Sequence, residues 1–270
     1  MPRSSRTLRS SAPRPPRSPR GWAIAGCLLG ALPAVLFFAP AQWLATGVER
    51  ASHGQVRLAQ ARGTVWTGSA QLVLAGGSGS ADQAALPGRL HWQLRPAWKG
   101  LRAQVNADCC TAQPLAARIE PRWGGAHVAI DDGQSQWPAA VLSGLGTPFN
   151  TLQPQGQLAL RTQGLTLDSA AGRVVIAGQA QLDALGMSSR LSTLRPMGSY
   201  RLNLQGGEVT TLTLSTLDGA LRLTGSGRWI GQRLRFEGEA TAAPEREGAL
   251  ANLLNIIGRR TGARSLITVG

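Results

Sequence analysis

Apolar and polar side chains alternate along most of the chain after residue 55, and a period of two predicts β-strands. The clearest run is residues 233–240, RLRFEGEA, where charged side chains fall on one face of a strand and apolar or small ones on the other. The same pattern predicts strands over 55–61, 64–75, 89–95, 101–107, 115–119, 157–161, 172–182, 202–205, 211–215 and 221–224. No helical patterns of about a dozen residues alternate with these strands, which argues against an α/β fold.

Turn residues between the runs indicate how the strands pair. Asp218-Gly219 lies between the Leu-x-Leu runs at 212–214 and 221–223, which is a strong signal for a β-hairpin. Tight turns imply an antiparallel sheet with one solvated face. We therefore expect a mainly β fold, built as a curved sheet, a sandwich or an open groove.

Two short helices interrupt the β pattern. One is expected over 138–144. The other is expected over 245–260, where acids come first and Arg259-Arg260 come last, as the helix dipole favours.

The N-terminal part has a different pattern. Residues 21–48 contain no charged side chain, and Trp22 and Trp43 are 21 residues apart. An α-helix of that length spans roughly 31 Å, close to the roughly 30 Å of a bilayer's hydrocarbon core. We therefore predict a transmembrane helix over 21–46, with Trp22 and Trp43 as anchors at the two membrane interfaces.

The residues around this span predict its orientation. Residues 1–20 hold six arginines and no acid among prolines and serines, which predicts a disordered basic tail on the cytoplasmic side. Residues 49–270 then form a periplasmic β-rich domain. The alternative is a signal peptide cleaved near Ala39-Pro40-Ala41, which would remove residues 1–41. Both interpretations export the rest of the chain.

Net charge changes this picture little. The chain has 270 residues, and 28 Lys+Arg against 14 Asp+Glu give a net charge of +14. Six of these charges lie in the tail, so the remainder carries 14 − 6 = +8. That charge is spread along the chain without an Arg-rich helix or an aromatic RNA motif, so we expect no nucleic-acid partner.

The sequence contains no pattern typical of an enzyme. His53, His91 and His127 have no spacing that suits a metal. Glu237 and Glu239 share a strand face with two arginines, which indicates a solvated row of charges. We predict no catalytic residue, no metal, no cofactor and no small-molecule substrate.

Cys109-Cys110 is the most distinctive local feature. Two cysteines seldom stay reduced in an oxidising compartment, and adjacent ones close only a small, strained ring. A vicinal disulfide, a cross-link between chains and two buried thiols all remain open. Our hypothesis is a vicinal disulfide in the loop 108–114, because Cys27 lies within the predicted span and cannot reach the pair.

Five stretches of the chain resemble the type II secretion system protein N family, also called general secretion pathway protein N. They are Gly63-Thr-Val-Trp-Thr-Gly68, Leu90-His-Trp-Gln-Leu-Arg-Pro96, Pro196-Met-Gly-Ser-Tyr-Arg-Leu202, Asp218-Gly-Ala-Leu-Arg-Leu-Thr-Gly-Ser-Gly-Arg-Trp229 and Leu253-Leu-Asn-Ile-Ile-Gly-Arg-Arg260. The basic tail and single span also fit this family.

The resemblance implies a non-enzymatic, single-pass protein of the Gram-negative inner membrane. Its periplasmic domain would contact other inner-membrane and periplasmic components of the machine that exports folded proteins across the outer membrane. The motif residues would then be fold determinants: Gly63, Trp66, Gly68, Trp92, Pro96, Tyr200, Gly219, Gly225, Gly227 and Trp229.

A second hypothesis comes from the Leu-x-Leu runs. A one-sided antiparallel sheet with a leucine-rich face can curl into an apolar groove that holds lipid. Leu202, Leu204, Leu212, Leu214, Leu221 and Leu223 would line that groove. The alternative function is therefore a periplasmic lipid-binding or lipid-transfer module.

Overall fold

The computed structural model of the chain describes residues 37–77, 80–170, 173–231 and 233–270, together with Gly26, Gly30, Ala34 and Val35. The predicted basic tail, Trp22 and most of the predicted span lie outside the described residues. Met1–Ala39 and Pro40–Gly270 are separate compact units, and the second is described by itself below. Within the described residues, no helix is both long enough and apolar enough to cross a membrane.

The second unit is dominated by β-strands. In chain order they are β1 (Val56–Gly63), β2 (Thr67–Ala75), β3 (Gln83–Ala85), β4 (Leu90–Ala97), β5 (Gly100–Ala107), β6 (Leu115–Arg122), β7 (Gly125–Ile130), β8 (Gly133–Pro138), β9 (Gln155–Ala170), β10 (Arg173–Ser188), β11 (Gly198–Gln205), β12 (Thr211–Gly219), β13 (Leu221–Ile230), β14 (Arg233–Ala242), β15 (Arg259–Thr261) and β16 (Arg264–Val269).

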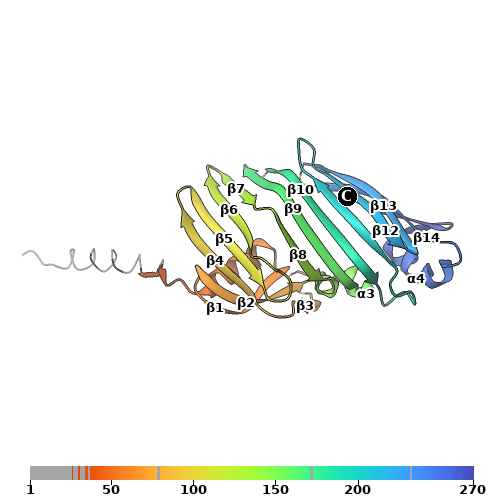
Figure 1. Cartoon of the computed structure of the whole chain (residues 1–270), viewed down its shortest axis with the longest axis horizontal. Coiled ribbons are helices and arrows are strands. Elements are labelled where there is room, and N and C mark those ends of the chain that lie inside the picture. The colour runs from red at the N-terminus through yellow and green to blue at the C-terminus, as the bar shows by residue number, and fades with distance from the viewer. Residues whose placement is uncertain are drawn as a thin grey trace, which may run out of the picture. The chain divides into compact units, whose positions relative to one another are not determined.

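All of these strands belong to one open antiparallel sheet (Figure 1). Its order is β1-β2-β4-β5-β6-β7-β9-β10-β11-β12-β13-β14-β16-β15, so most neighbours in the sheet are also neighbours along the chain. The prediction of a mainly β, antiparallel fold is confirmed, and the structure is a single sheet in place of a sandwich. The predicted hairpin at Asp218-Gly219 is also present, because β12 and β13 pair with each other on either side of it.

Two strands of the sheet have two partners along one edge. β2 pairs with β4 through Thr67–Ala70 and with β3 through Val73–Ala75. β9 pairs with β8 through its first half and with β7 through its second half, while β10 follows its other edge. The break between β7 and β8 falls at Asp131-Asp132.

In the part of the chain that the structure describes, four short helices accompany the sheet. They are α2 (Ala41–Ala51), the 3₁₀ helix η1 (Ala139–Leu145), α3 (Phe149–Leu152) and α4 (Glu247–Ile257). The expected helix over 138–144 is therefore a 3₁₀ helix. The expected helix over 245–260 ends earlier, because Gly258 is extended and Arg259–Thr261 turn into β15.

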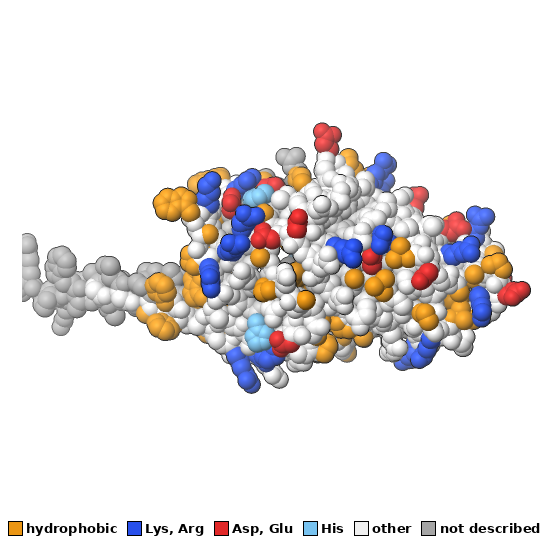
Figure 2. All heavy atoms as spheres, viewed as in Figure 1, with side chains coloured by type: hydrophobic (Ala, Val, Ile, Leu, Met, Phe, Trp, Pro, Cys, Tyr) orange, Lys and Arg blue, Asp and Glu red, His pale blue; other side chains and the backbone are white. Residues whose placement is uncertain are grey.

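Strand register separates the sheet into two faces. Leu160, Leu182, Leu202 and Leu214 are directly opposite one another across β9–β12 and mark what we call the apolar face. Their chain neighbours Arg161, Gln181, Asn203 and Thr213 are likewise in register and mark the polar face. Figure 2 looks onto the sheet from the polar side, where charged side chains of both signs are scattered among polar ones.

Helices cover only parts of the apolar face. α2 contributes Ala41 to a cluster with Ala70 and Trp92, and η1 contributes Val141 to a cluster with Leu86 and Cys110. A larger cluster joins the α4 leucines Leu250, Leu253 and Leu254 to the sheet, through buried residues that include Leu158, Tyr200 and Leu221. In Figure 1, α3 and α4 lie along the lower border of the sheet, and no helix covers the upper ends of β6, β7, β9 and β10.

Candidate interaction surfaces

The first two sequence motifs meet in the structure. Trp92 is 4% exposed and its indole Nε1 donates a hydrogen bond to the carbonyl of Val65 at 3.0 Å. Gly68 lies opposite Trp92 in the sheet, and a Cβ at Gly68 would collide with the Trp92 ring. Gly63 has a φ of +90° in the turn before β2, which favours glycine. These residues hold β2 against β4.

The third and fourth motifs also meet. Gly198 and Gly219 are opposite each other on β11 and β12, at the place where the buried Tyr200 side chain folds back over Gly198. Burial raises the pKa of the Tyr200 phenol well above its usual value. Its hydroxyl has no hydrogen-bond partner among the described residues. The contact therefore depends on packing.

Phe236 explains Gly225 and Gly227 of the fourth motif. Its ring lies over β13, where a Cβ at Gly225 or Gly227 would meet it, and a Cβ at Gly238 of its own strand would also lie within 3.0 Å of the ring. Phe236 itself is buried. The three glycines thus form the space that the aromatic ring occupies.

The other motif residues are more exposed. Trp66 is half-buried in the turn before β2, and Trp229 is half-buried on β13. Pro96 is exposed near the end of β4. The predicted membrane anchor Trp43 is exposed on α2, which packs on β1. The roles predicted for Trp22 and Trp43 at a membrane stay predictions.

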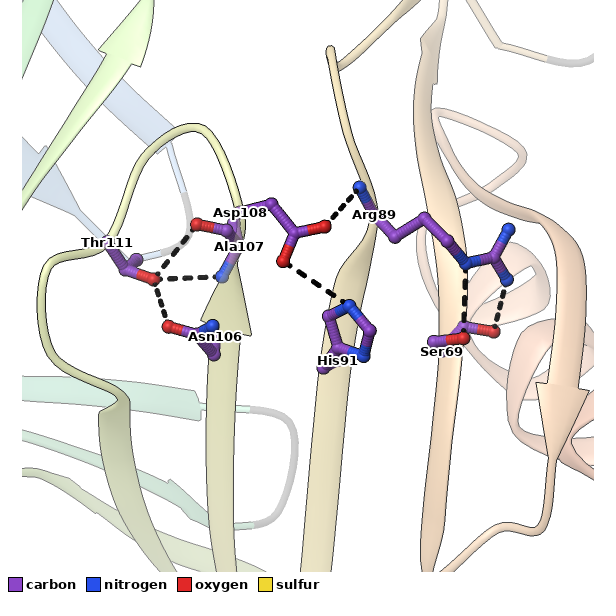
Figure 3. A network of polar contacts seen from close by, with 7 residues as sticks. All are labelled: Ser69, Arg89, His91, Asn106, Ala107, Asp108 and Thr111. Carbon is purple, nitrogen blue, oxygen red and sulfur yellow. Dashed lines mark hydrogen bonds and ion pairs between the residues drawn. The ribbon is translucent and has the colours of Figure 1, made fainter.

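A polar network fixes the turn after β5 (Figure 3). Asp108 accepts a hydrogen bond from the Arg89 backbone N–H at 3.2 Å and lies 3.4 Å from His91 Nε2. Thr111 Oγ1 donates to Asn106 and accepts from the Ala107 N–H at 2.8 Å. The side chains on both sides of the turn are therefore held in place.

Cys109 and Cys110 lie within this turn. The structure joins their sulfurs, and Cys110 is buried against Leu86 and Val141 while Cys109 is exposed. The Cys110 carbonyl accepts a hydrogen bond from the Gln136 N–H of β8 at 2.8 Å. We propose that Cys109 and Cys110 form a vicinal disulfide. It would restrict the backbone of a turn that forms a hydrogen bond with β8.

Alkylation tests the disulfide directly. We expect the denatured full chain to take up two more maleimide groups after reduction than before, because reduction frees Cys109 and Cys110. Intact mass measures the difference, and monomeric mass without reductant excludes a cross-link between chains. Equal uptake before and after reduction would show two free thiols instead.

Charged residues on the polar face form separate pairs. Asp168 accepts from His127 at 2.7 Å and from Arg122 at 3.1 Å, and Asp131 lies between Arg102 and Arg118. Glu239 of β14 pairs with Arg264 of β16 at 3.4 Å. Among the described residues, no group of three or more His, Cys, Asp or Glu is placed to hold a metal ion.

The best-formed pair joins Arg201 to Asp183 through two hydrogen bonds of 2.7 and 2.9 Å. The hydrogen bonds from the Arg201 guanidinium hold the pKa of Asp183 below its usual value, although partial burial opposes this. A carboxylate whose pKa is lowered in the folded state stabilises the fold above its unfolded pKa, and this contribution disappears as the pH falls through the folded pKa.

We therefore expect Arg201→Gln to lower the free energy of unfolding at pH 7 and to have progressively less effect below about pH 4. Urea unfolding of the wild-type chain and of Arg201→Gln between pH 7 and pH 3 measures the difference in their free energies of unfolding. If this difference stays constant over the pH range, Arg201 stabilises the sheet by packing alone.

The apolar face carries a row of side chains outside the three buried clusters. Leu101, Ile119, Val128, Leu167 and Ile176 are opposite one another, strand by strand, from β5 to β10. All five are half-buried, and none belongs to a cluster with a helix. We call them the apolar row. At about 4.8 Å per strand the row is roughly 19 Å long.

The edges of the sheet are less suited to binding than this row. At β1 the Ser52 hydroxyl hydrogen-bonds both the N–H and the carbonyl of Val56, and Pro40 forms a bridge with Thr64. At the other edge β15 is three residues long and includes Arg259 and Arg260. Short or covered edges with charged residues resist pairing with further strands. A partner would therefore bind more readily to a face of the sheet.

A comparison with protein families agrees with the sequence motifs. The model of the family described as type II secretion system (T2SS), protein N, matches residues 54–267. This match includes every strand of the sheet apart from the last two residues of β16. No curated protein and no solved structure matches the chain.

Proposed function

Because the chain belongs to the type II secretion system protein N family, we propose that its β unit contacts other components of that machine during the export of folded proteins. Family membership makes the chain a component of a type II secretion system, in a family that is structural and generally non-enzymatic. The proposal adds the place of contact: the periplasm, with the N-terminal segment anchored in the inner membrane and the tail in the cytoplasm.

The apolar row supports this proposal most directly. Its five aliphatic side chains form a continuous surface that no described helix covers. A contiguous apolar surface on a solvent-exposed face of a protein commonly marks a site of protein or membrane interaction. Because both sheet edges are short or covered, the row is the surface that we assign to partner components.

Secretion assays test the assignment. Deleting the gene is expected to reduce secretion of folded exoproteins. Val128→Glu is expected to reduce it about tenfold or more, because a partner would bury an unpaired carboxylate at a cost of several kcal/mol. Secreted exoprotein in the culture medium, at equal chain level by immunoblot, is the measurement.

Ala129→Glu is the matched control. It adds the same charge one residue further along β7, on the polar face opposite Arg118. We expect secretion to stay near the wild-type level. If both variants lose secretion equally, or if neither loses it, the apolar row is not the surface that contacts partner components.

The length of the row favours one second candidate, the binding of a lipid chain. Roughly 19 Å of aliphatic surface is comparable with the roughly 15 Å of half a bilayer's hydrocarbon core. Mass spectrometry of lipids that co-purify with the full chain distinguishes the two functions. Stoichiometric lipid that disappears in Val128→Glu would favour lipid binding, and its absence from the wild-type chain would exclude it.

A further inference from the structure

The polar face contains a groove that the proposed function does not use. Two adjoining cavities of about 880 and 450 Å³ share Ala112, Gln134 and Arg161 as lining residues. Their floor consists of β8, β9 and β10, and their walls are the turn after β5 and the Asp131–Gly133 segment. The larger volume is within the range of about 300–1,000 Å³ that is typical of ligand sites.

Glutamine amides dominate the floor of this groove. Gln134 and Gln181 flank Arg161 on the neighbouring strands, and Gln163 lies opposite Gln179. Gln181 donates to Asp183, whereas the side chains of Gln134, Gln163 and Gln179 form no hydrogen bond with any described residue. Each free amide offers two donors and one acceptor oxygen. We call Gln134, Arg161, Gln163, Gln179 and Gln181 the amide groove.

Arg161 is the cationic side chain that lines both cavities. Arg201 already holds both oxygens of Asp183. Arg102 and Arg118 pair with Asp131. Asp132 accepts from the Gly164 N–H at 2.6 Å. The Arg161 charge helps to lower the pKa of Asp183, but among the described residues the guanidinium forms no ion pair and no hydrogen bond.

We propose that the amide groove binds an extended peptide segment that carries a carboxylate, with Arg161 pairing with the carboxylate. Guanidinium and carboxylate groups match in a two-bond geometry, and glutamine amides complement the N–H and C=O groups of a peptide main chain. The net charge of +8 outside the tail, from 22 cations and 14 acids, attracts an acidic segment.

Other ligand classes fit the lining less well. It contains no aromatic ring on which a sugar could stack. An acyl chain would leave the glutamine amides and the Arg161 guanidinium of the lining without polar partners. The groove is on the face opposite the apolar row, so this proposal does not depend on the docking role proposed above.

Fluorescence anisotropy on the purified full chain tests the site. The probe is a fluorescein-labelled, C-terminally amidated peptide of alternating glycine and serine with one central glutamate. A second probe replaces the glutamate by glutamine. We expect the glutamate probe to bind about tenfold more tightly, because a hydrogen bond to a charged partner strengthens binding by about that factor.

Two variants locate the binding. Arg161→Gln should bring both probes to the same weak affinity. Gln134→Glu should do so as well, because the new carboxylate lies opposite Arg161 and pairs with it while Arg161 remains in place. Arg222→Gln is the matched control: it removes an arginine from the polar face of β13, outside the groove, and should preserve the preference. Thermal unfolding of each variant checks that it folds.

Several results would overturn the proposal. The first is equal affinity of the wild-type chain for the two probes, and the second is no detectable binding at millimolar concentration. The third is that Arg222→Gln loses the preference for the glutamate probe to the same extent as Arg161→Gln. Displacement of the probe by sodium acetate as effective as by the unlabelled peptide would show a site for a simple anion. Displacement by maltoheptaose would show a saccharide site.

Discussion

Trp92→Ala is expected to lower the free energy of unfolding by about 3–5 kcal/mol, the range for removing a buried large aromatic side chain. The Trp92 ring fills the space that Gly68 leaves on the neighbouring strand. It also contributes to the cluster that joins α2 to the sheet, with Ala41 and Ala70. The indole hydrogen bond to Val65 is lost as well. Chemical unfolding of the purified full chain, followed by circular dichroism, measures the change.

Trp98→Ala is the control for this experiment. Trp98 follows β4 only six residues after Trp92, yet it is 97% exposed. Its removal should change the free energy of unfolding by less than about 0.5 kcal/mol, as for most surface substitutions. If both variants unfold at the same denaturant concentration as the wild-type chain, Trp92 does not anchor β2 to β4.

A second large effect is expected at α4. Leu254 is 1% exposed and belongs to the cluster that joins α4 to Leu158 and Tyr200 on the sheet. Leu254→Ala should cost about 2–5 kcal/mol, because it removes buried methyl groups and leaves a cavity. The backbone carbonyl of Leu254, which accepts a hydrogen bond from Ser265, is unchanged by this substitution. The same unfolding measurement applies.

Ile256→Ala supplies the comparison two residues further along the helix. Ile256 is 43% exposed and lies outside the cluster. A much smaller loss is expected there. If Ile256→Ala cost as much as Leu254→Ala, α4 would be stabilised by its own helical structure, and its docking on the sheet would contribute little.

The strand pattern of this fold could be predicted because one face of the sheet is apolar. Runs such as residues 233–240 alternate without interruption, and the corresponding strand is β14. The ends of α4 could not be predicted in the same way. Arg259-Arg260 suit the end of a helix, but the chain uses them in β15, where they pair with Ser265 and Leu266. The pairing of β15 with β16 therefore determines where α4 ends.

The amide groove could not be predicted from the sequence, because its residues come from three strands. Gln134 and Gln136, Arg161 and Gln163, and Gln179 and Gln181 are each two residues apart, so the alternation signals a polar face on three strands. Only the register brings Gln134, Arg161 and Gln181 side by side. The double pairing of β9 has no such signal, because nothing local indicates that β7 and β8 share one edge of it.

The order of the strands in the sheet has a consequence for how the chain folds. Because β5–β7 and β9–β14 each pair with their predecessors in the sequence, most contacts between strands close a short loop. Short loops close at a low entropic cost and favour rapid folding. A chain that emerges N-terminus first can therefore complete each hairpin soon after its second strand appears. The docking of α4 on Leu158 and Tyr200 and the pairing of β16 with β14 must wait for the C-terminal end.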